Sequence, residues 1–224
     1  MNKKLGVDLS VYQGDVVSGK HVDSIDWERV NSALGEESFV IVQLTQGLGY
    51  VNPICSDQSK NAKRVSKLGL YHFGHPEKNS AKMEADFFLS QIHRNDVPTA
   101  DLIPALDIEQ VFVNGVEQKI PYDTLETWVN TFAEEMSNGG FPKIMIYSNP
   151  GFLNANLAKH HSLGKYPLWL SEYTHGALIY PNGWNECVIL QNSGTGHVDG
   201  INHPVDTNIL EGDYSSILLA PNVS

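Results

Sequence analysis

Cysteine is scarce in this chain of 224 residues, and that scarcity restricts the chemistry it can carry. Cys55 and Cys187 are the two cysteines, and no cysteine pair has the short spacing of a zinc site. Both lie in apolar or strand-like surroundings, where a buried free thiol is the ordinary state, and a disulfide between them is the alternative. None of the nine histidines belongs to a His-Glu-x-x-His helix. We therefore expect neither a metal site nor a cofactor.

Basic residues are also few. The chain has 15 lysines and arginines against 26 aspartates and glutamates, which gives a formal net charge of −11. A protein that binds nucleic acid needs a basic face to neutralise phosphates, so we expect no nucleic-acid partner. The acidic surplus fits a soluble surface, a cleft rich in carboxylates, or both.

Long apolar runs are missing, and no segment approaches the length of a membrane span. Lys3 and Lys4 resemble the start of a signal peptide, but Asp8 follows before an apolar segment can form. We therefore expect no membrane partner and no signal peptide in the chain, although a secreted protein whose leader had been removed would look the same.

Short apolar runs alternate with helical patterns along the chain. Strands are expected at residues 5–9, 39–45, 69–73, 102–108, 143–148, 168–171, 188–191 and 205–209. Helices are expected at residues 27–34, 56–67, 80–93 and 123–137, with a short one at 151–159. Most of the strands are apolar almost throughout, as strands buried on both faces are.

This alternation predicts parallel strands joined by crossover helices, and eight strands are enough to close a small barrel. Helices become few after Pro150, and no linker divides the chain. We therefore expect an α/β protein with one domain, residues 1–224, that forms an incomplete or distorted (β/α) barrel.

In such a barrel the reactive groups lie at the carboxyl ends of the strands and in the loops that follow them. Several predicted strands end in acidic, amide or aromatic side chains. These are Asp8, Asp107, Glu109, Tyr147, Asn149, Glu172 and Tyr173, and the last strand begins with Val205-Asp206. The pattern predicts a polar site at one end of the barrel.

The segment Asp107-Ile108-Glu109 is the sharpest feature of that set. Side chains two apart on a strand share a face, so both carboxyl groups are expected to point the same way, with Ile108 in the opposite layer. Two acids this close cannot both ionise freely, and burial raises the pKa of the drier one. The segment thus predicts one proton donor beside one charged carboxylate, which is the pairing that glycoside hydrolysis uses.

Several further motifs occur in order along nearly the whole chain. They are residues 6–14 (Gly-Val-Asp-Leu-Ser-Val-Tyr-Gln-Gly), 70–73 (Leu-Tyr-His-Phe), 105–109 (Ala-Leu-Asp-Ile-Glu), 147–149 (Tyr-Ser-Asn), 168–169 (Leu-Trp), 190–191 (Leu-Gln), 196–200 and 205–208 (Val-Asp-Thr-Asn). In this order and spacing they resemble the glycoside hydrolase family 25 lysozymes, the Chalaropsis-type muramidases that include phage endolysins.

The resemblance implies a flattened, incomplete TIM-like barrel with a carboxylate-rich groove. It implies that the single domain is a glycoside hydrolase domain that acts on peptidoglycan glycan strands. No cell-wall-anchoring repeat is recognisable in the chain, so we expect no separate cell-wall-binding domain, and we expect a monomer. The bond cut would be the β-1,4 bond between N-acetylmuramic acid and N-acetylglucosamine, with net retention. Such a protein would be released at host lysis, carried on a phage particle, or secreted if a leader had been removed.

The resemblance also assigns roles to the acids. Glu109 would be the general acid and base, and Asp107 would stabilise the charge that develops at the anomeric centre. Asp107 would do so either by orienting the substrate's N-acetyl group as an internal nucleophile or by attacking the anomeric carbon itself. Asp8 and Asp206 would complete the acidic cluster.

Substrate contacts are expected from aromatic and amide side chains. The resemblance implies that Tyr71, Tyr147 and Trp169 contact the sugar, although plain core packing is the alternative. The remaining candidates are Gln13, Gln191 and Asp199, each of which either faces the groove or stabilises a turn.

One motif departs from the family. The second strand has Gln43 and Gln46 where the family often has a lysine and the glutamate of Thr-Glu-Gly. We expect a hydrogen-bonded pair of amides to replace a supporting ion pair, with the catalytic acids unaffected.

Two other interpretations remain open at this point. The first is a glycan-binding or virion structural protein that keeps the barrel without the activity. The second is a different hydrolase on a similar barrel, such as a chitinase-like enzyme, although the alternating aspartates typical of those enzymes are absent around Ile103 and Ala105.

Overall fold

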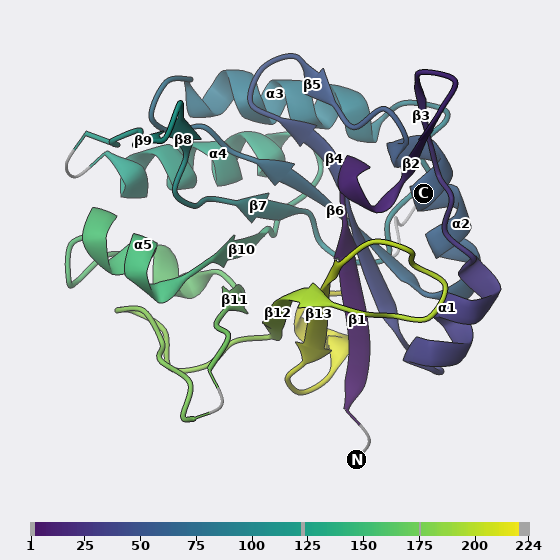
Figure 1. The fold of residues 1–224 in the computed structure, drawn as a ribbon. Coiled ribbons are helices and arrows are strands. Elements are labelled where there is room, and N and C mark those ends of the chain that lie inside the picture. Colours follow the sequence, from purple (N-terminus) through teal and green to yellow (C-terminus); the bar gives the residue numbers. More distant parts are fainter. Residues whose placement is uncertain (1–2, 122–123, 175, 220–224) are drawn as a thin grey trace.

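The computed structural model describes residues 3–121, 124–174 and 176–219. Eight of the nine strands of its main sheet close into a barrel, because β1 pairs with both β4 and β13 (Figure 1). The barrel strands are β1 (Lys4–Leu9), β4 (Phe39–Gln46), β6 (Lys67–Phe73), β7 (Ala105–Asp107), β10 (Met145–Ser148), β11 (Leu168–Ser171), β12 (Ile189–Gly196) and β13 (Val205–Leu210). The ninth strand, β5 (Tyr50–Val51), pairs only with β4.

Strand direction follows from the connections. All neighbouring barrel strands from β1 through β4, β6, β7, β10 and β11 to β12 run parallel, and β13 is antiparallel to both β12 and β1. Parallel strands need a long crossover, whereas residues 197–204 are a short connection that turns the chain back. The predicted barrel of mainly parallel strands is confirmed.

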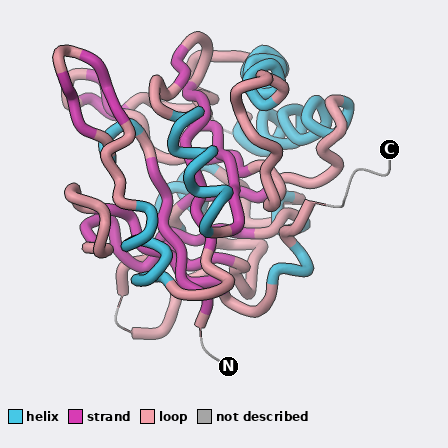
Figure 2. The backbone as a smooth tube through the Cα atoms, turned by 90° about the vertical axis from the view of Figure 1, so that its right-hand side faces the viewer, coloured by secondary structure: helices cyan, strands magenta, loops and turns pink. Residues whose placement is uncertain are grey.

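Five helices lie between successive parallel strands. They are α1 (Trp27–Leu34), α2 (Cys55–Val65), α3 (Ala81–Ile92), α4 (Leu125–Asn138) and α5 (Pro150–Asn156). Seen from the side of α1 and α2, the helices lie outside the strands (Figure 2). In the described part of the chain after β11 there is no α-helix, so the barrel wall is thinner there, as the sequence predicted. Residue 123, where the fourth predicted helix begins, lies outside the described residues.

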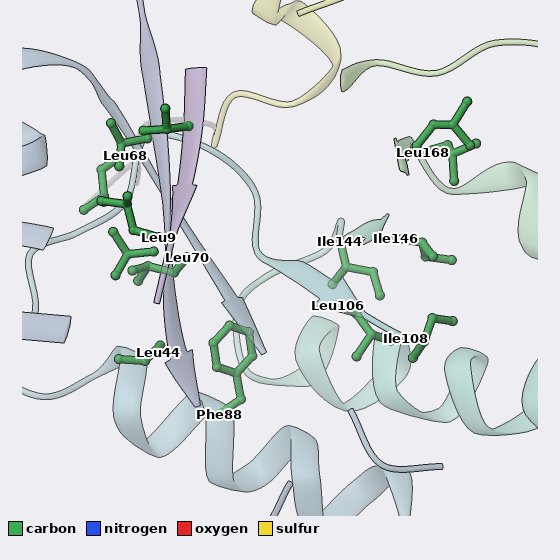
Figure 3. Close-up of a cluster of buried hydrophobic side chains, with 14 of the residues drawn as sticks. Leu9, Leu44, Leu68, Leu70, Phe88, Leu106, Ile108, Ile144, Ile146 and Leu168 are labelled. Carbon is green, nitrogen blue, oxygen red and sulfur yellow. The ribbon is translucent and has the colours of Figure 1, made fainter. Parts of the chain in front are cut away.

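The strands bury both faces. Phe39 and Ile41 point into the barrel interior, whereas Val40 and Val42 pack in the outer layer against the helices. Figure 3 shows part of that outer layer, including Leu106 and Ile108. Ile108 thus packs away from the barrel interior, which agrees with the predicted alternation.

The strand that carries the acids is shorter than predicted. It begins at Ala105, and Leu102 makes only an isolated bridge to Leu218. Pro104 has no backbone N–H to donate to the sheet, so it ends the pairing on that side. At its other end β7 stops at Asp107, so Glu109 lies in the loop beyond the strand.

Two hairpins were not predicted. One joins β2 (Asp15–Val17) to β3 (Lys20–Val22), and the other joins β8 (Phe112–Val113) to β9 (Val116–Glu117). Both follow shortly after a barrel strand, so they lie near the carboxyl ends of the strands. Among the described residues, no helix has the length and apolar character of a bilayer span.

Candidate active site

A pocket of about 420 Å³ opens at the carboxyl ends of the parallel strands. Its wall combines four carboxyl groups with aromatic rings and amides. The lining residues are Asp8, Ser10, Val11, Tyr12, Gln43, Gln46, Tyr50, Tyr71, Phe73, Asp107, Glu109, Tyr147, Trp169, Gln191 and Asp206. No lysine or arginine is among them, so no cation balances the carboxyl groups inside the pocket.

The four carboxyl groups come from distant parts of the sequence. Asp8 on β1 lies opposite Asp206 on β13, Asp107 ends β7, and Glu109 follows it. The structure therefore brings together all four acids that the sequence singled out. The side chains of Asp8 and Asp107 are nearly buried, in residues that are 7 % and 6 % exposed.

Among the four carboxyl groups of the pocket, Asp8 accepts the most hydrogen bonds. Its Oδ2 accepts from Asn208 Nδ2 at 2.7 Å and from Gln191 Nε2 at 3.0 Å. Burial raises the pKa of Asp8 to about 6, against the opposing effect of these hydrogen bonds. Burial and the neighbouring Asp8 carboxylate raise the pKa of Asp206 to about 8. At neutral pH this pair therefore carries its charge on Asp8 and a proton on Asp206.

Asp107 has the opposite surroundings. Its Oδ1 is buried and has no hydrogen-bond partner among the described residues. Burial, followed by the charges of Glu109, Asp8 and Asp206, raises the pKa of Asp107 well above its ordinary range. A buried oxygen without a partner is costly, so this carboxyl group is prepared to pair with a group from outside the protein.

Glu109 lies where two pockets meet. It lines the acidic pocket and also a neighbouring pocket of about 580 Å³, together with Tyr147. Burial and the charge of Asp8 raise the pKa of Glu109 to about 7. The sequence predicted one protonated and one charged acid in this pair, but burial raises the pKa of both, and the charge of the cluster is best stabilised on Asp8.

Gln191 connects the acids to the tyrosines. Its Oε1 accepts hydrogen bonds from Tyr147 at 2.9 Å, Ser171 at 3.1 Å and Tyr173 at 2.6 Å, while its Nε2 donates to Asp8. A single amide thus fixes the orientation of three hydroxyl groups and one carboxylate. The sequence placed Tyr173 among the polar residues at strand ends but gave it no role in the site. Its position just after the sixth strand was the signal that could have assigned one.

This geometry agrees with the comparisons with known proteins. The sequence matches the family model of glycosyl hydrolases family 25 over residues 7–201. The chain belongs to this family. It is a glycoside hydrolase, as the sequence predicted.

Two relatives and one solved structure show how closely other family members match this chain. Lysozyme M1 of Streptomyces globisporus is 27% identical over 219 residues, which cover 97% of this chain and 71% of that protein. N,O-diacetylmuramidase of a Chalaropsis species is 26% identical over 212 residues, with 91% and 94% covered. The crystal structure of a bacterial lysozyme from Streptomyces coelicolor superposes with a TM-score of 0.79 at 27% identity, and covers 94% of this chain and 93% of that one.

The aromatic wall of this family 25 chain is more buried than a stacking surface would be. Trp169 is 1 % exposed, and its Nε1 donates to Asn208 Oδ1 at 2.8 Å. Its ring meets Tyr71 and Tyr147 edge to face, with centroids 6.3 and 4.7 Å away. These three rings therefore form a rigid floor that also orients Asn208 toward Asp8. Tyr12, which is 79 % exposed, is the most exposed ring in the pocket lining, and it was not predicted.

Gln13 and Asp199 lie outside the pocket lining. Gln13 accepts a hydrogen bond from the backbone N–H of Ser10 at 2.8 Å and donates to the carbonyl of Pro204 at 3.0 Å, so it stabilises a turn. Asp199 is exposed and pairs with Arg29 of α1. For Gln13 the structure favours the turn-stabilising alternative over groove contact, whereas the ion pair of Asp199 with Arg29 was not predicted.

Gln43 and Gln46 both line the pocket, but the expected hydrogen bond between their side chains does not form. Gln46 Nε2 lies 3.0 Å from His75 Nε2 instead. The amide nitrogen can only donate, so His75 accepts at Nε2, and its Nδ1 carries the proton and donates to Glu77 at 2.7 Å. The pair of amides was a wrong prediction, because the partner of Gln46 comes from the loop after β6.

A second polar network lies behind the strands. His72 on β6 contacts Thr45 Oγ1 through Nδ1 at 2.7 Å and Glu84 Oε2 through Nε2 at 2.9 Å. Glu84 also accepts from the backbone N–H of His75 at 3.0 Å and from Asn79 at 2.6 Å. Thr45, His72 and Glu84 are fully buried, and burial lowers the pKa of His72. The network anchors α3 to the barrel wall.

Cys55 and Cys187 are both buried free thiols, so the disulfide alternative is wrong. Burial raises the pKa of Cys187 to about 11, which keeps it protonated. Among the described residues, no group of histidine, cysteine, aspartate and glutamate side chains is arranged to hold a metal ion.

Proposed function

We propose that the protein is an N-acetylmuramidase that hydrolyses the β-1,4 bond between N-acetylmuramic acid and N-acetylglucosamine in peptidoglycan, with net retention. The observation that carries this proposal is the position of Glu109, a carboxyl group with a raised pKa at the junction of two pockets. A glycosidic oxygen between two bound sugars would lie at such a junction. The muramidase relative supports the choice of bond.

In this mechanism Glu109 first donates its proton to the glycosidic oxygen, and the bond from that oxygen to the anomeric carbon breaks. Glu109 then removes a proton from water, which attacks the anomeric carbon and regenerates the acid. A pKa of about 7 lets one group perform both transfers near neutral pH.

Asp107 stabilises the positive charge at the anomeric centre. Its unpartnered Oδ1 either receives the N–H of the substrate's acetamido group, whose carbonyl oxygen then bonds to the anomeric carbon, or bonds to that carbon itself. In both routes one displacement forms the intermediate and a second displacement by water restores the original configuration. Two inversions give net retention.

The catalytic arrangement has the proton on Glu109 and the charge on Asp107. In the free protein this is a minor arrangement, because the acids titrate as one group and Asp8 holds the charge most readily. A sugar that develops positive charge beside Asp107 favours ionisation at that position. Asp8 and Asp206 thereby form a carboxyl pair next to the reacting groups that can accept or release one proton.

We also propose that one domain carries this activity and that it acts as a monomer. One barrel contains all four acids, so the site that we propose needs no second domain.

The proposal is tested by digesting purified peptidoglycan and identifying the new reducing ends by mass spectrometry. Muramic acid at the new reducing ends is the expected result. Reducing-end N-acetylglucosamine would show a glucosaminidase, and binding without release of fragments would show a glycan-binding protein. The anomer first released, followed by NMR, decides between retention and inversion.

A further inference from the structure

A third pocket, of about 310 Å³, continues from the acidic pocket on the side away from Glu109. Gln46 and Tyr50 line both pockets, so the two share a wall. The rest of its lining comes from the turn between β4 and β5 and from the loop after β6, namely Gly47, Leu48, His75, Lys78 and Asn79. The proposed function gives this pocket no role.

The charge changes sign between the two pockets. The acidic pocket has four carboxyl groups and no cation in its lining, whereas the third pocket has Lys78 and no carboxyl group in its lining. Within the described residues, Lys78 makes no ion pair. The adjacent Glu77 is directed to His75 Nδ1, at 2.7 Å. An exposed ammonium group is therefore available beside a strongly acidic region.

The wall between the pockets is held in place by hydrogen bonds. Gln46 Nε2 lies 3.0 Å from His75 Nε2, and His75 Nδ1 lies 2.7 Å from Glu77, so the histidine is fixed on both sides. Gly47 has a φ of +49°, and a Cβ there would lie 2.8 Å from His75 Cδ2, so the turn packs closely on the histidine. Leu48 and Tyr50 add exposed apolar surface at the rim. The pocket thus offers one cation, amides and an apolar edge, which suits a short peptide with a carboxylate.

We propose that the third pocket binds a carboxylate of the peptide that peptidoglycan carries on its muramic acid, with Lys78 as the counterion. This inference rests on the proposed function. For cleavage at its anomeric carbon, the muramic acid must lie over Asp107 in the acidic pocket. The peptide attached to that sugar then extends from the acidic pocket onto an adjoining surface. The adjoining pocket on the side away from the leaving group is the one that contains Lys78.

The alternative occupant is the next sugar of the glycan strand. The two occupants differ in what happens when the peptides are removed. A pocket for a peptide carboxylate loses its ligand, whereas a pocket for a sugar keeps it.

The experiment compares two substrates, intact peptidoglycan and the same glycan after an amidase has removed the peptides. The kcat/KM for release of reducing ends is measured at low salt for the native protein, Lys78→Ala, Lys78→Arg and Lys143→Ala. Lys143 is a matched control, because it is an exposed lysine before β10, at the opposite end of the barrel from the pockets.

We expect Lys78→Ala to lower kcat/KM about fivefold on intact peptidoglycan, the effect of losing one exposed charge pair, with no change on the stripped glycan. Lys78→Arg keeps most of the native rate, Lys143→Ala behaves as native, and salt weakens the Lys78 effect. An equal loss on both substrates would assign the pocket to a sugar, and no loss on either would show that Lys78 binds nothing; both results overturn the inference. If the native protein releases no muramic acid ends from either substrate, the proposed function fails as well.

Discussion

Adjacent residues on β6 face two polar clusters that differ in one respect. Tyr71 faces the acidic pocket inside the barrel, and His72 faces the network with Glu84 outside it. Both clusters contain buried ionisable groups. In the outer network each carboxylate oxygen and each imidazole nitrogen has a partner within 3.0 Å, whereas in the pocket Asp107 Oδ1 has none.

The difference separates stabilising groups from reactive ones. A buried charge with complete hydrogen bonding is held in place and contributes to the stability of the fold. A buried carboxyl group without a hydrogen-bond partner lowers the stability of the fold, and it acquires a partner only when a ligand binds. Substitutions in the pocket should therefore change activity and leave stability the same or higher, and substitutions in the outer network should do the reverse.

The largest effect is expected for Glu109→Gln. This change removes the proton donor at constant shape, and general acid catalysis contributes about 10²–10⁴-fold. Turnover on purified peptidoglycan, measured by reducing-end release, should fall by that factor while the unfolding temperature does not drop. A variant that keeps more than about a tenth of the native rate is incompatible with the acid role.

The next effect is expected for Glu84→Ala, in the outer network. Removing this carboxylate leaves His72, Asn79 and the backbone N–H of His75 without their partner, and each unsatisfied buried group costs about 1–3 kcal/mol. The unfolding temperature should fall by about 2–4 °C for each kcal/mol. Glu134→Ala is the control, since Glu134 is an exposed residue of α4 that forms no ion pair with any residue that the structure describes. A loss of activity at unchanged stability would place Glu84 in the reaction instead.

A smaller effect of opposite sign is expected for Asp206→Asn. The pKa of Asp206 rises from 3.8 to about 8 on folding, so its contribution to stability is complete below pH 3.8 and is lost as the pH rises through about 8. Asparagine has no such pH dependence and still offers an N–H to Asp8. The variant should unfold at a higher temperature than the native protein at about pH 9, and the advantage should disappear near pH 4. A variant that is less stable at both pH values would contradict the unfavourable ionisation of Asp206.

The smallest effect is expected for Tyr173→Phe. This substitution removes one of the three hydroxyl groups that donate to Gln191 and keeps the ring. One hydrogen bond contributes about 1 kcal/mol, so kcat/KM should fall about fivefold or less. The unfolding temperature should be nearly unchanged, because the side chain is largely exposed. A large loss of stability would mean that Tyr173 is part of the core and not of the site.

The barrel and the four acids were predictable because they depend on local patterns. Apolar strands alternating with helices specify the parallel barrel, and a strand that ends in Asp-x-Glu places Asp107 at its mouth. The reversal of β13 was not predicted, because a strand carries no mark of its direction.

Side-chain partners were the part that sequence could not supply. Asp199 pairs with Arg29 and Gln46 with His75, and neither partner is a neighbour in the sequence. The raised pKa of Asp107 depends on desolvation by several strands together, and a local motif does not contain that information.

The pairing of the first strand with the last has a consequence for the timing of activity. Asp8 and Asp206 meet only when β13 inserts between β1 and β12, and β13 is the barrel strand that is synthesised last. A growing chain that stops short of it has an open wall, no paired acids and no hydrogen bond from Asn208 to Asp8. A hydrolase of this design therefore cannot assemble its acid cluster until the segment that forms β13 has been synthesised.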